Sequence, residues 1–386
     1  YVQDKIELAS TLILNVGLRY EYFDPKSDYN PNLSSDLLDL KFGYITRSNK
    51  PAKPKQHVSP RVSVSYPITD KGVIRFSYGH FYQNGSLASL YSNPLFYVAN
   101  VGSSPSFGNP NVNMQRSVQY EIGLQQQLAD DLKMEITGYY KDVRDYIYSQ
   151  TVFTETGRQF SVLTNLAYSN VRGISLHLEK RKAATDLFYA SLDYTFQVAE
   201  GNRTYPSDDL FFSEVSGKQT ETYLVPLGFD RPHVVNITFG LSQPNDWTLG
   251  LIGNLQAGTP YTPQFPSQVV PITFTQNSAN QPFQWNVDFK LEKFFMLGSI
   301  KYSIFLHVDN LFDTQNELSV YASTGRALKT IDEAVNPTFF NDIKNRINRG
   351  DPGLMPISEI NGYYTNRPER VNRPREVRLG FSLLFN

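Results

Sequence analysis

The chain has 386 residues, of which 40% are hydrophobic and 14% aromatic, with a formal net charge of −1 and no cysteine. A charge this close to zero gives no electrostatic reason to expect nucleic acid or an anionic membrane surface as a partner. The lack of cysteine excludes disulfides and thiolate metal sites, and the many aromatic residues suit strands and the aromatic girdles of membrane barrels.

Alternation of apolar and polar residues predicts β-strands from the start of the chain. Residues 1–8 are predicted to form one strand, and residues 12–22 place an apolar side chain at every second position after a tight turn. The same pattern predicts further strands at 62–66, 74–78, 118–124, 134–148, 174–178, 188–196, 235–241, 247–255, 285–291, 300–308 and 375–386. The pattern thus predicts about 13 strands in an all-β chain.

The connections between these strands alternate between tight turns and long polar segments, such as residues 24–58 and 85–116. An up-and-down barrel in an outer membrane has this asymmetry, with short periplasmic turns and longer external loops. The strands exceed those of a typical soluble sandwich, and no blade repeat indicates a propeller. No apolar run is long enough for a membrane-spanning helix. We therefore predict a transmembrane antiparallel up-and-down β-barrel, because only helices and closed barrels satisfy the backbone in lipid.

The tight turns lie on the side of the predicted sheet where the chain ends, so we expect a periplasmic C-terminus and external loops. Bacterial single-chain barrels have even strand numbers, and the chain starts as if within a strand. We therefore expect residues upstream of Tyr1, and further strands from that part or from a partner chain to cover the first strand's edge.

Several stretches resemble known outer-membrane sequences. The last strand, with Arg378, Gly380, Leu383 and Phe385, resembles the C-terminal signal by which outer-membrane barrels are recognised for assembly, although its aromatic residue is penultimate. Residues 308–327 resemble the closing signature of TonB-dependent outer-membrane receptors. The motif positions are Asn310, Leu311, Phe312, Asp313, Tyr321, Gly325 and Arg326. Residues 14–25, 59–62, 76–82 and 109–123 are similar to the Bacteroidota-type and Oar-like branch of this family.

This resemblance implies a complete barrel of 22 strands with a plugged lumen, of which residues 1–386 are the C-terminal portion. The plug domain, its TonB box and the N-terminal strands are then absent from this sequence. The resemblance also implies TonB as a partner through that plug, outer-membrane lipid as surroundings, and energy-coupled uptake of a bulky solute in a Gram-negative bacterium. It does not name the solute.

No catalytic constellation is evident: the five histidines are scattered, and no P-loop, GxSxG or HExxH motif occurs. We interpret His177 and His307 as polar lining of a wet barrel, and Asp309 and Asp313 as turn residues rather than a Ca²⁺ site. We therefore predict no enzyme, no cofactor and no metal. Charged residues of both signs on the predicted lumen face indicate a hydrated wall that contacts a plug, namely Arg19, Arg61, Glu121, Glu179, Asp193, Asp288, Lys290 and Glu292.

The longest predicted loop spans about residues 317–374. Asn336 and Pro337 are expected to start a short helix that ends at Gly350. Tyr321, Arg326, Tyr363 and Tyr364 are candidates for binding a ligand or a partner protein, and the alternative is a loop that packs on its neighbours and closes the barrel mouth. Two other functions stay open: a plugless passive porin, and an outer-membrane scaffold that binds partner proteins.

Overall fold

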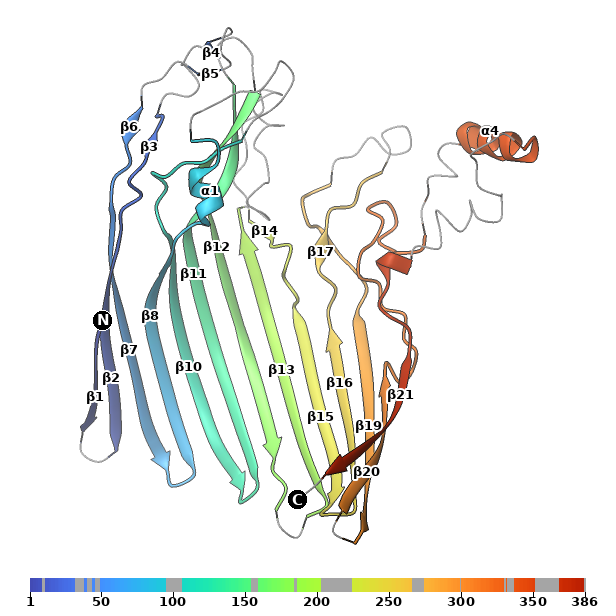
Figure 1. The fold of residues 1–386 in the computed structure, drawn as a ribbon. Coiled ribbons are helices and arrows are strands. Elements are labelled where there is room, and N and C mark those ends of the chain that lie inside the picture. The colour runs from blue at the N-terminus through green and yellow to red at the C-terminus, as the bar shows by residue number, and fades with distance from the viewer. Residues whose placement is uncertain are drawn as a thin grey trace. The chain divides into compact units, whose positions relative to one another are not determined.

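The structure, a computed structural model, is almost entirely β (Figure 1). It describes residues 1–386 except for 9–10, 32–37, 40–43, 46–48, 95–105, 154–158, 184–185, 203–223, 266–273, 299, 330, 332–336, 351–367 and 385–386. Across the described ranges, no helix is long and apolar enough to span a membrane.

One antiparallel path of strands connects neighbours in chain order. The strands on this path are β1 (Val2–Leu8), β2 (Leu12–Phe23), β7 (Lys55–Thr69), β8 (Gly72–Gln83), β10 (Gln115–Ala129), β11 (Leu132–Phe153), β12 (Gln159–Lys180), β13 (Phe188–Gly201), β15 (His233–Gln243), β16 (Trp247–Gln256), β19 (Gln284–Leu297), β20 (Ile300–Asp309) and β21 (Glu376–Leu384). The predicted antiparallel all-β architecture is confirmed. Closure into a barrel of 22 strands stays a prediction.

Short elements fill the connections. They are β3 (Asp28–Tyr29), β4 (Leu38–Asp39), β5 (Tyr44–Ile45), β6 (Lys50–Pro51), α1 (Leu87–Tyr91), β9 (Ser106–Phe107), β14 (Val225–Pro226), β17 (Pro260–Tyr261), β18 (Ala279–Asn280), α4 (Pro337–Asn348) and η1 (Pro368–Arg370). The predicted helix after Asn336 is confirmed as α4, and Gly350 beyond its end has the positive φ of +74° that suits glycine. Asn336 itself lies outside the described residues.

The chain forms two compact units. The first comprises residues 1–124, 138–172 and 199–227, and the second comprises residues 125–137, 173–198 and 228–386.

In the first unit, the cross-strand register separates an apolar face from a polar face. Leu14 lies opposite Val64, and Asn15 lies opposite Ser63. Directly opposed residues in antiparallel strands share a face, so even positions of β2 lie on the apolar face and odd positions lie on the polar face. The alternation read from residues 12–22 is therefore preserved across the neighbouring strands.

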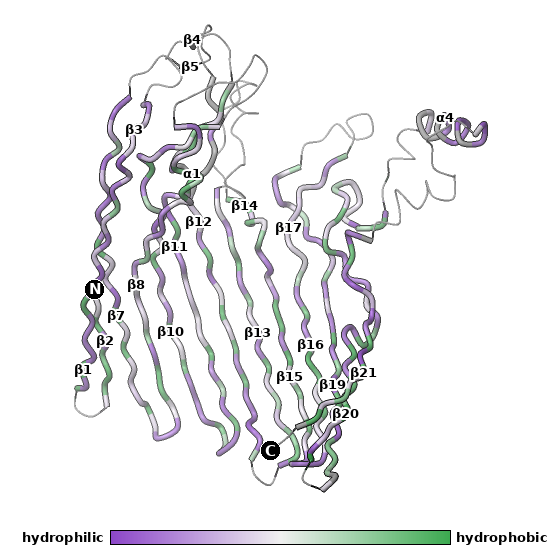
Figure 2. Tube along the Cα trace, viewed as in Figure 1, coloured by the Kyte–Doolittle hydropathy of each residue, from purple (hydrophilic) through white to green (hydrophobic). Residues whose placement is uncertain are grey.

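The second unit repeats this separation in its last strands. Phe381 lies opposite Ile304 on the apolar face, and Ser382 lies opposite Ser303 on the polar face. Although it is apolar, Phe381 is 58% exposed, and Leu379 is 76% exposed. A self-contained soluble protein would bury such a row of large side chains. Apolar positions recur along the strands of this unit (Figure 2), so its apolar face needs an apolar medium.

The buried apolar cluster in the first unit lies where the long connections begin. Leu90 of α1 packs with Val112 and Ile147, and all three are buried. Ser86 caps the N-terminus of helix α1: its Oγ accepts a hydrogen bond from the Ser89 backbone N–H at 3.0 Å. We did not predict this helix, because five residues are too few to show a helical period.

Strands β11 and β12 are longer than predicted, at 22 residues each. We predicted that regular structure would end at residue 148 and resume at 174. Instead, the hairpin continues, and β9 joins it through a parallel pairing of Phe107 with Val162. The extension was missed because residues 149–173 mix polar and apolar side chains without strict alternation.

Candidate functional site

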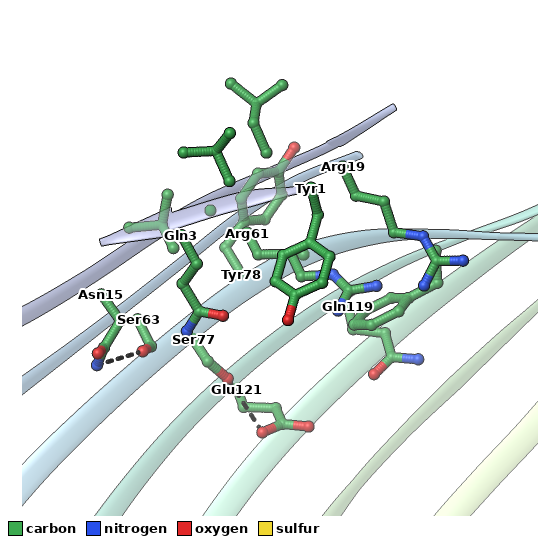
Figure 3. Close-up of a pocket in the computed structure, with 16 residues that line it drawn as sticks. Tyr1, Gln3, Asn15, Arg19, Arg61, Ser63, Ser77, Tyr78, Gln119 and Glu121 are labelled. Carbon is green, nitrogen blue, oxygen red and sulfur yellow. Dashed lines mark hydrogen bonds between the residues drawn. The ribbon is translucent and has the colours of Figure 1, made fainter. Parts of the chain in front are cut away.

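A hollow of about 490 Å³ lies on the polar face of the first unit (Figure 3). Its walls come from β2, β7 and β8, with the first residues of the chain on one side and β10 on the other. The polar and charged residues that line it are Tyr1, Gln3, Asn15, Arg19, Arg61, Ser63, Ser77, Tyr78, Gln119 and Glu121. Arg19, Arg61 and Glu121 are three of the residues predicted to face the lumen.

The hollow exists because two glycines flank one arginine. Gly17 of β2 and Gly79 of β8 lie opposite Arg61 of β7, one on each side. A Cβ atom at Gly79 would lie 3.0 Å from the Phe81 ring, which is tighter than ordinary contact. The lack of side chains at both positions leaves room around Arg61.

Aromatic packing positions the Arg61 guanidinium. Its Cζ atom lies 4.7 Å from the centroid of the Phe81 ring, a cation–π distance. Nearby, Arg19 forms an ion pair with Glu21 at 2.9 Å. Among the described residues no carboxylate pairs with Arg61, so its hydrogen-bond donors stay available.

Hydrogen bonds order the opposite end of the hollow. The Ser77 hydroxyl donates to Glu121 at 3.0 Å, and the Asn15 amide donates to Ser63 at 3.2 Å. The hollow therefore has a cationic end at Arg61 and an anionic end at Glu121. This arrangement can bind a polar group by directional, charge-assisted hydrogen bonds.

A second hollow, of about 410 Å³, lies on the polar face of the second unit. Its lining includes Asn254, Asp288 and Arg378. Its polar groups are largely engaged: Asp288 accepts hydrogen bonds from the Asn286 amide at 2.7 Å and from the Asn310 backbone N–H at 2.8 Å. Arg378 donates to Asp309 and Glu376. We therefore assign this region a structural role, because its polar side chains bind to one another.

The motif at residues 310–313 forms a turn that anchors the last strand. Asn310 is buried, and its amide donates to the backbone oxygens of Thr314 at 3.0 Å and Arg373 at 3.2 Å. Asp313 accepts a hydrogen bond from the Arg375 backbone N–H at 2.8 Å. Both motif residues have positive φ, 55° for Asn310 and 54° for Asp313, a region that Asn and Asp tolerate better than most residues. The other two members lie at the surface of this turn: Leu311 donates its backbone N–H to Val287, and Phe312 packs near Trp285.

The motif at residues 321–326 is a second turn. Gly325 has a φ of 67°, and a Cβ atom there would overlap the hydroxyl of Tyr261. The Arg326 guanidinium donates to Glu317 at 2.7 Å, and this hydrogen bond raises the pKa of Arg326 above its ordinary value. Arg370 lies 3.9 Å from the centroid of the Tyr321 ring. The structure thus involves Tyr321 and Arg326 in contacts within their own loop.

The other predicted site residues are placed only in part. Leu383 is exposed on the apolar face, and Gly380 packs against Phe305 on the polar face. Phe385, Tyr363 and Tyr364 lie outside the described residues. The grouping of the four loop candidates into one site therefore stays a prediction.

Sequence reasoning missed the residues that hold the loop ends to the sheet. Asn316 is buried; it accepts a hydrogen bond from the Trp285 backbone N–H at 2.9 Å and donates to the Trp285 oxygen at 2.7 Å. Arg231 donates to the Ala257 oxygen at 2.9 Å, and burial lowers its pKa. Neither residue belongs to an alternating run, so no sequence pattern identifies it.

A hydrogen bond of 2.6 Å joins the ring Nδ1 of His177 and the Asp193 carboxylate. This contact joins two of the predicted wall residues on neighbouring strands. Within the described part of the chain, no group of three or more histidine, aspartate or glutamate residues is arranged to hold a metal ion.

One family model matches most of the chain. The family model described as "TonB dependent receptor-like, beta-barrel" matches residues 1–311. No curated protein matches the chain.

Several solved structures share the fold. The outer membrane transporter YddB from Escherichia coli is 12% identical with a TM-score of 0.56, over 81% of this chain and 49% of that one. The FrpB iron transporter from Neisseria meningitidis is 13% identical with a TM-score of 0.53, over 81% and 40%. The ferric-catecholate import receptor Fiu from E. coli is 16% identical with a TM-score of 0.51, over 84% and 41%. This chain therefore spans less than half of each of these proteins.

Proposed function

This chain belongs to the TonB-dependent receptor-like β-barrel family, and from that premise we propose that it is the C-terminal barrel portion of an outer-membrane transporter. The whole protein would take up a bulky solute across the outer membrane of a Gram-negative bacterium, with energy supplied through TonB. The family consists of receptors and transporters rather than enzymes.

The observation that supports membrane insertion best is the exposed apolar face. Leu379 and Phe381 are exposed in β21, and Ile122, at 61% exposure, is exposed in β10. Burying such side chains in hydrocarbon contributes about 25 cal/mol per Å² of apolar area. The opposite face is lined by hydrogen-bonded polar groups, which suit a water-filled or plugged lumen.

Completion of the barrel is part of the same proposal. In the described residues, β1 pairs with β2 alone and β21 pairs with β20 alone. An unpaired strand edge in lipid leaves backbone groups unsatisfied at a cost of several kcal/mol each. We infer that further strands outside residues 1–386 pair with both edges, in a barrel of 22 strands. The tight turns would then face the periplasm, together with the C-terminus.

A planar-bilayer conductance measurement on the full-length protein tests the coupled mechanism. A plugged transporter is expected to show no steady ion conductance, and to bind the periplasmic domain of TonB in a pull-down. Steady open-channel conductance without TonB binding would contradict the proposal and support a passive porin. Stoichiometric capture of a surface protein, with no conductance and no TonB binding, would instead support a scaffold.

A further inference from the structure

We propose that the hollow around Arg61 is a binding site for a carboxylate group. The carboxylate comes either from a solute or from a segment of the full-length protein outside residues 1–386. Nothing in the family assignment names this site, and its binding chemistry does not depend on energy coupling.

The Arg61 guanidinium is accessible to a ligand. It is exposed, and it is held by the Phe81 ring at 4.7 Å rather than by a carboxylate of the described residues. A guanidinium presents parallel N–H donors in a planar fork that fits a carboxylate in a bidentate manner. Ring contact restrains the side chain, so less rotamer freedom is lost when a ligand binds.

The Arg61 guanidinium also has open space in front of it. Gly17 and Gly79 are the cross-strand partners of Arg61 on its two sides. The nearest atom to a Cβ built at Gly17 is 3.6 Å away, so a side chain would fit there and narrow the hollow. Glycine at both positions keeps the approach to Arg61 open.

The charges around the hollow favour a ligand with a single carboxylate. Arg19 is paired with Glu21 at 2.9 Å, whereas Glu121, among the described residues, accepts a hydrogen bond from the neutral hydroxyl of Ser77 and has no ion-pair partner. One cation and one anion are thus left at opposite ends. A multiply charged anion such as a phosphate cluster would be repelled by Glu121, while a zwitterion can place its carboxylate at Arg61 and its cationic group toward Glu121.

Calorimetric titration of the full-length protein with triglycine tests the proposal, because this peptide has one carboxylate and one ammonium group. We expect Arg61→Gln to weaken binding by about tenfold to a hundredfold, as expected for lost hydrogen bonds to a charged group. Triglycine amide, which lacks the carboxylate, should lose a similar factor with the unchanged protein. Arg61→Lys keeps the charge without the fork and should also weaken binding.

Arg75→Gln is the matched control, since Arg75 lies on the same polar face opposite Ser65 but outside the hollow. It should leave triglycine binding unchanged.

If triglycine does not bind, a structure of the full-length protein decides the source of the carboxylate. A protein carboxylate within hydrogen-bond distance of the Arg61 guanidinium would support the site and assign it to an internal contact. Absence of both triglycine binding and such a carboxylate would overturn the proposal. Because none of these readouts involves TonB or transport, they can succeed even if the proposed function fails.

Discussion

The ring of Phe305 lies over Gly380, its cross-strand partner, so closely that a Cβ atom at position 380 would overlap the ring. Gly380 is one of the residues that resemble the barrel-assembly signal. In this fold a glycine is needed at position 380 because it leaves room for an aromatic side chain from β20 on the polar face. The same arrangement recurs where Tyr189 lies over Gly240.

Gly380→Ala should therefore destabilise the folded barrel. The added methyl group forces the Phe305 ring to move, and overpacking of this kind costs about 1–3 kcal/mol. Gly250→Ala is the control, because the nearest atom to its Cβ would be Lys290 Cβ at 4.0 Å. Urea unfolding of the full-length protein in lipid vesicles measures both variants; equal midpoints would show that the Phe305 contact is unimportant.

Asn310→Gly separates the two roles of the motif asparagine. Glycine keeps the positive φ but removes the amide that donates to Thr314 and Arg373 and the oxygen that accepts from the Thr314 backbone N–H at 2.8 Å. Leaving buried backbone groups unpaired costs about 1–3 kcal/mol. We expect a lowered unfolding midpoint and faster proteolysis of the adjoining loop. Unchanged stability would mean that the motif is kept for another purpose.

Glu317→Gln tests whether Arg326 acts in loop structure. The Glu317 carboxylate accepts hydrogen bonds from Arg326 at 2.7 Å and from the Ala327 backbone N–H at 2.5 Å. Loss of its charge should loosen the loop as much as Arg326→Ala does, and a double-mutant cycle should show coupling. Additive effects in the cycle would indicate that Arg326 makes its main contact elsewhere, as expected for a residue that binds a partner.

The turn after β12 predicts a pH effect. A hydrogen bond from Lys180 lowers the pKa of Asp186 below its ordinary value of 3.8. The stabilisation is therefore fully present above that ordinary value and is lost as the pH falls through the lower pKa of the folded state. Asp186→Asn should lower the unfolding midpoint at neutral pH and match the unchanged protein at strongly acidic pH. A difference that persists in acid would exclude this ion pair as the cause.

The strands and their faces could be predicted because alternation is local. Residues 12–22 already distinguish the two faces, and the register opposite β7 agrees. The hollow at Arg61 could not be predicted, because it depends on Gly17 and Gly79 becoming neighbours of Arg61 through strand pairing. The role of Gly380 depends in the same way on Phe305. Asn316 was missed for a related reason. Its side chain forms hydrogen bonds with the backbone N–H and oxygen of Trp285, which is distant in the sequence.

The central claim is that one face of the sheet contacts hydrocarbon and the other contacts water, and neighbouring residues of β15 test it directly. Ile237 lies opposite Gly253 and is 48% exposed, whereas Thr238 lies opposite Ile252 on the other face. Residues 1–386 contain no cysteine, so Ile237→Cys and Thr238→Cys each introduce a single attachment point in this part of the chain for a nitroxide spin label. Collision rates with oxygen and with a water-soluble nickel complex are then measured on the full-length protein in lipid vesicles. The label at position 237 should collide mainly with oxygen. The label at 238 should collide less with oxygen, relative to the nickel complex, than the label at 237. Equal access of the nickel complex to both labels, or the reverse order, would contradict the account.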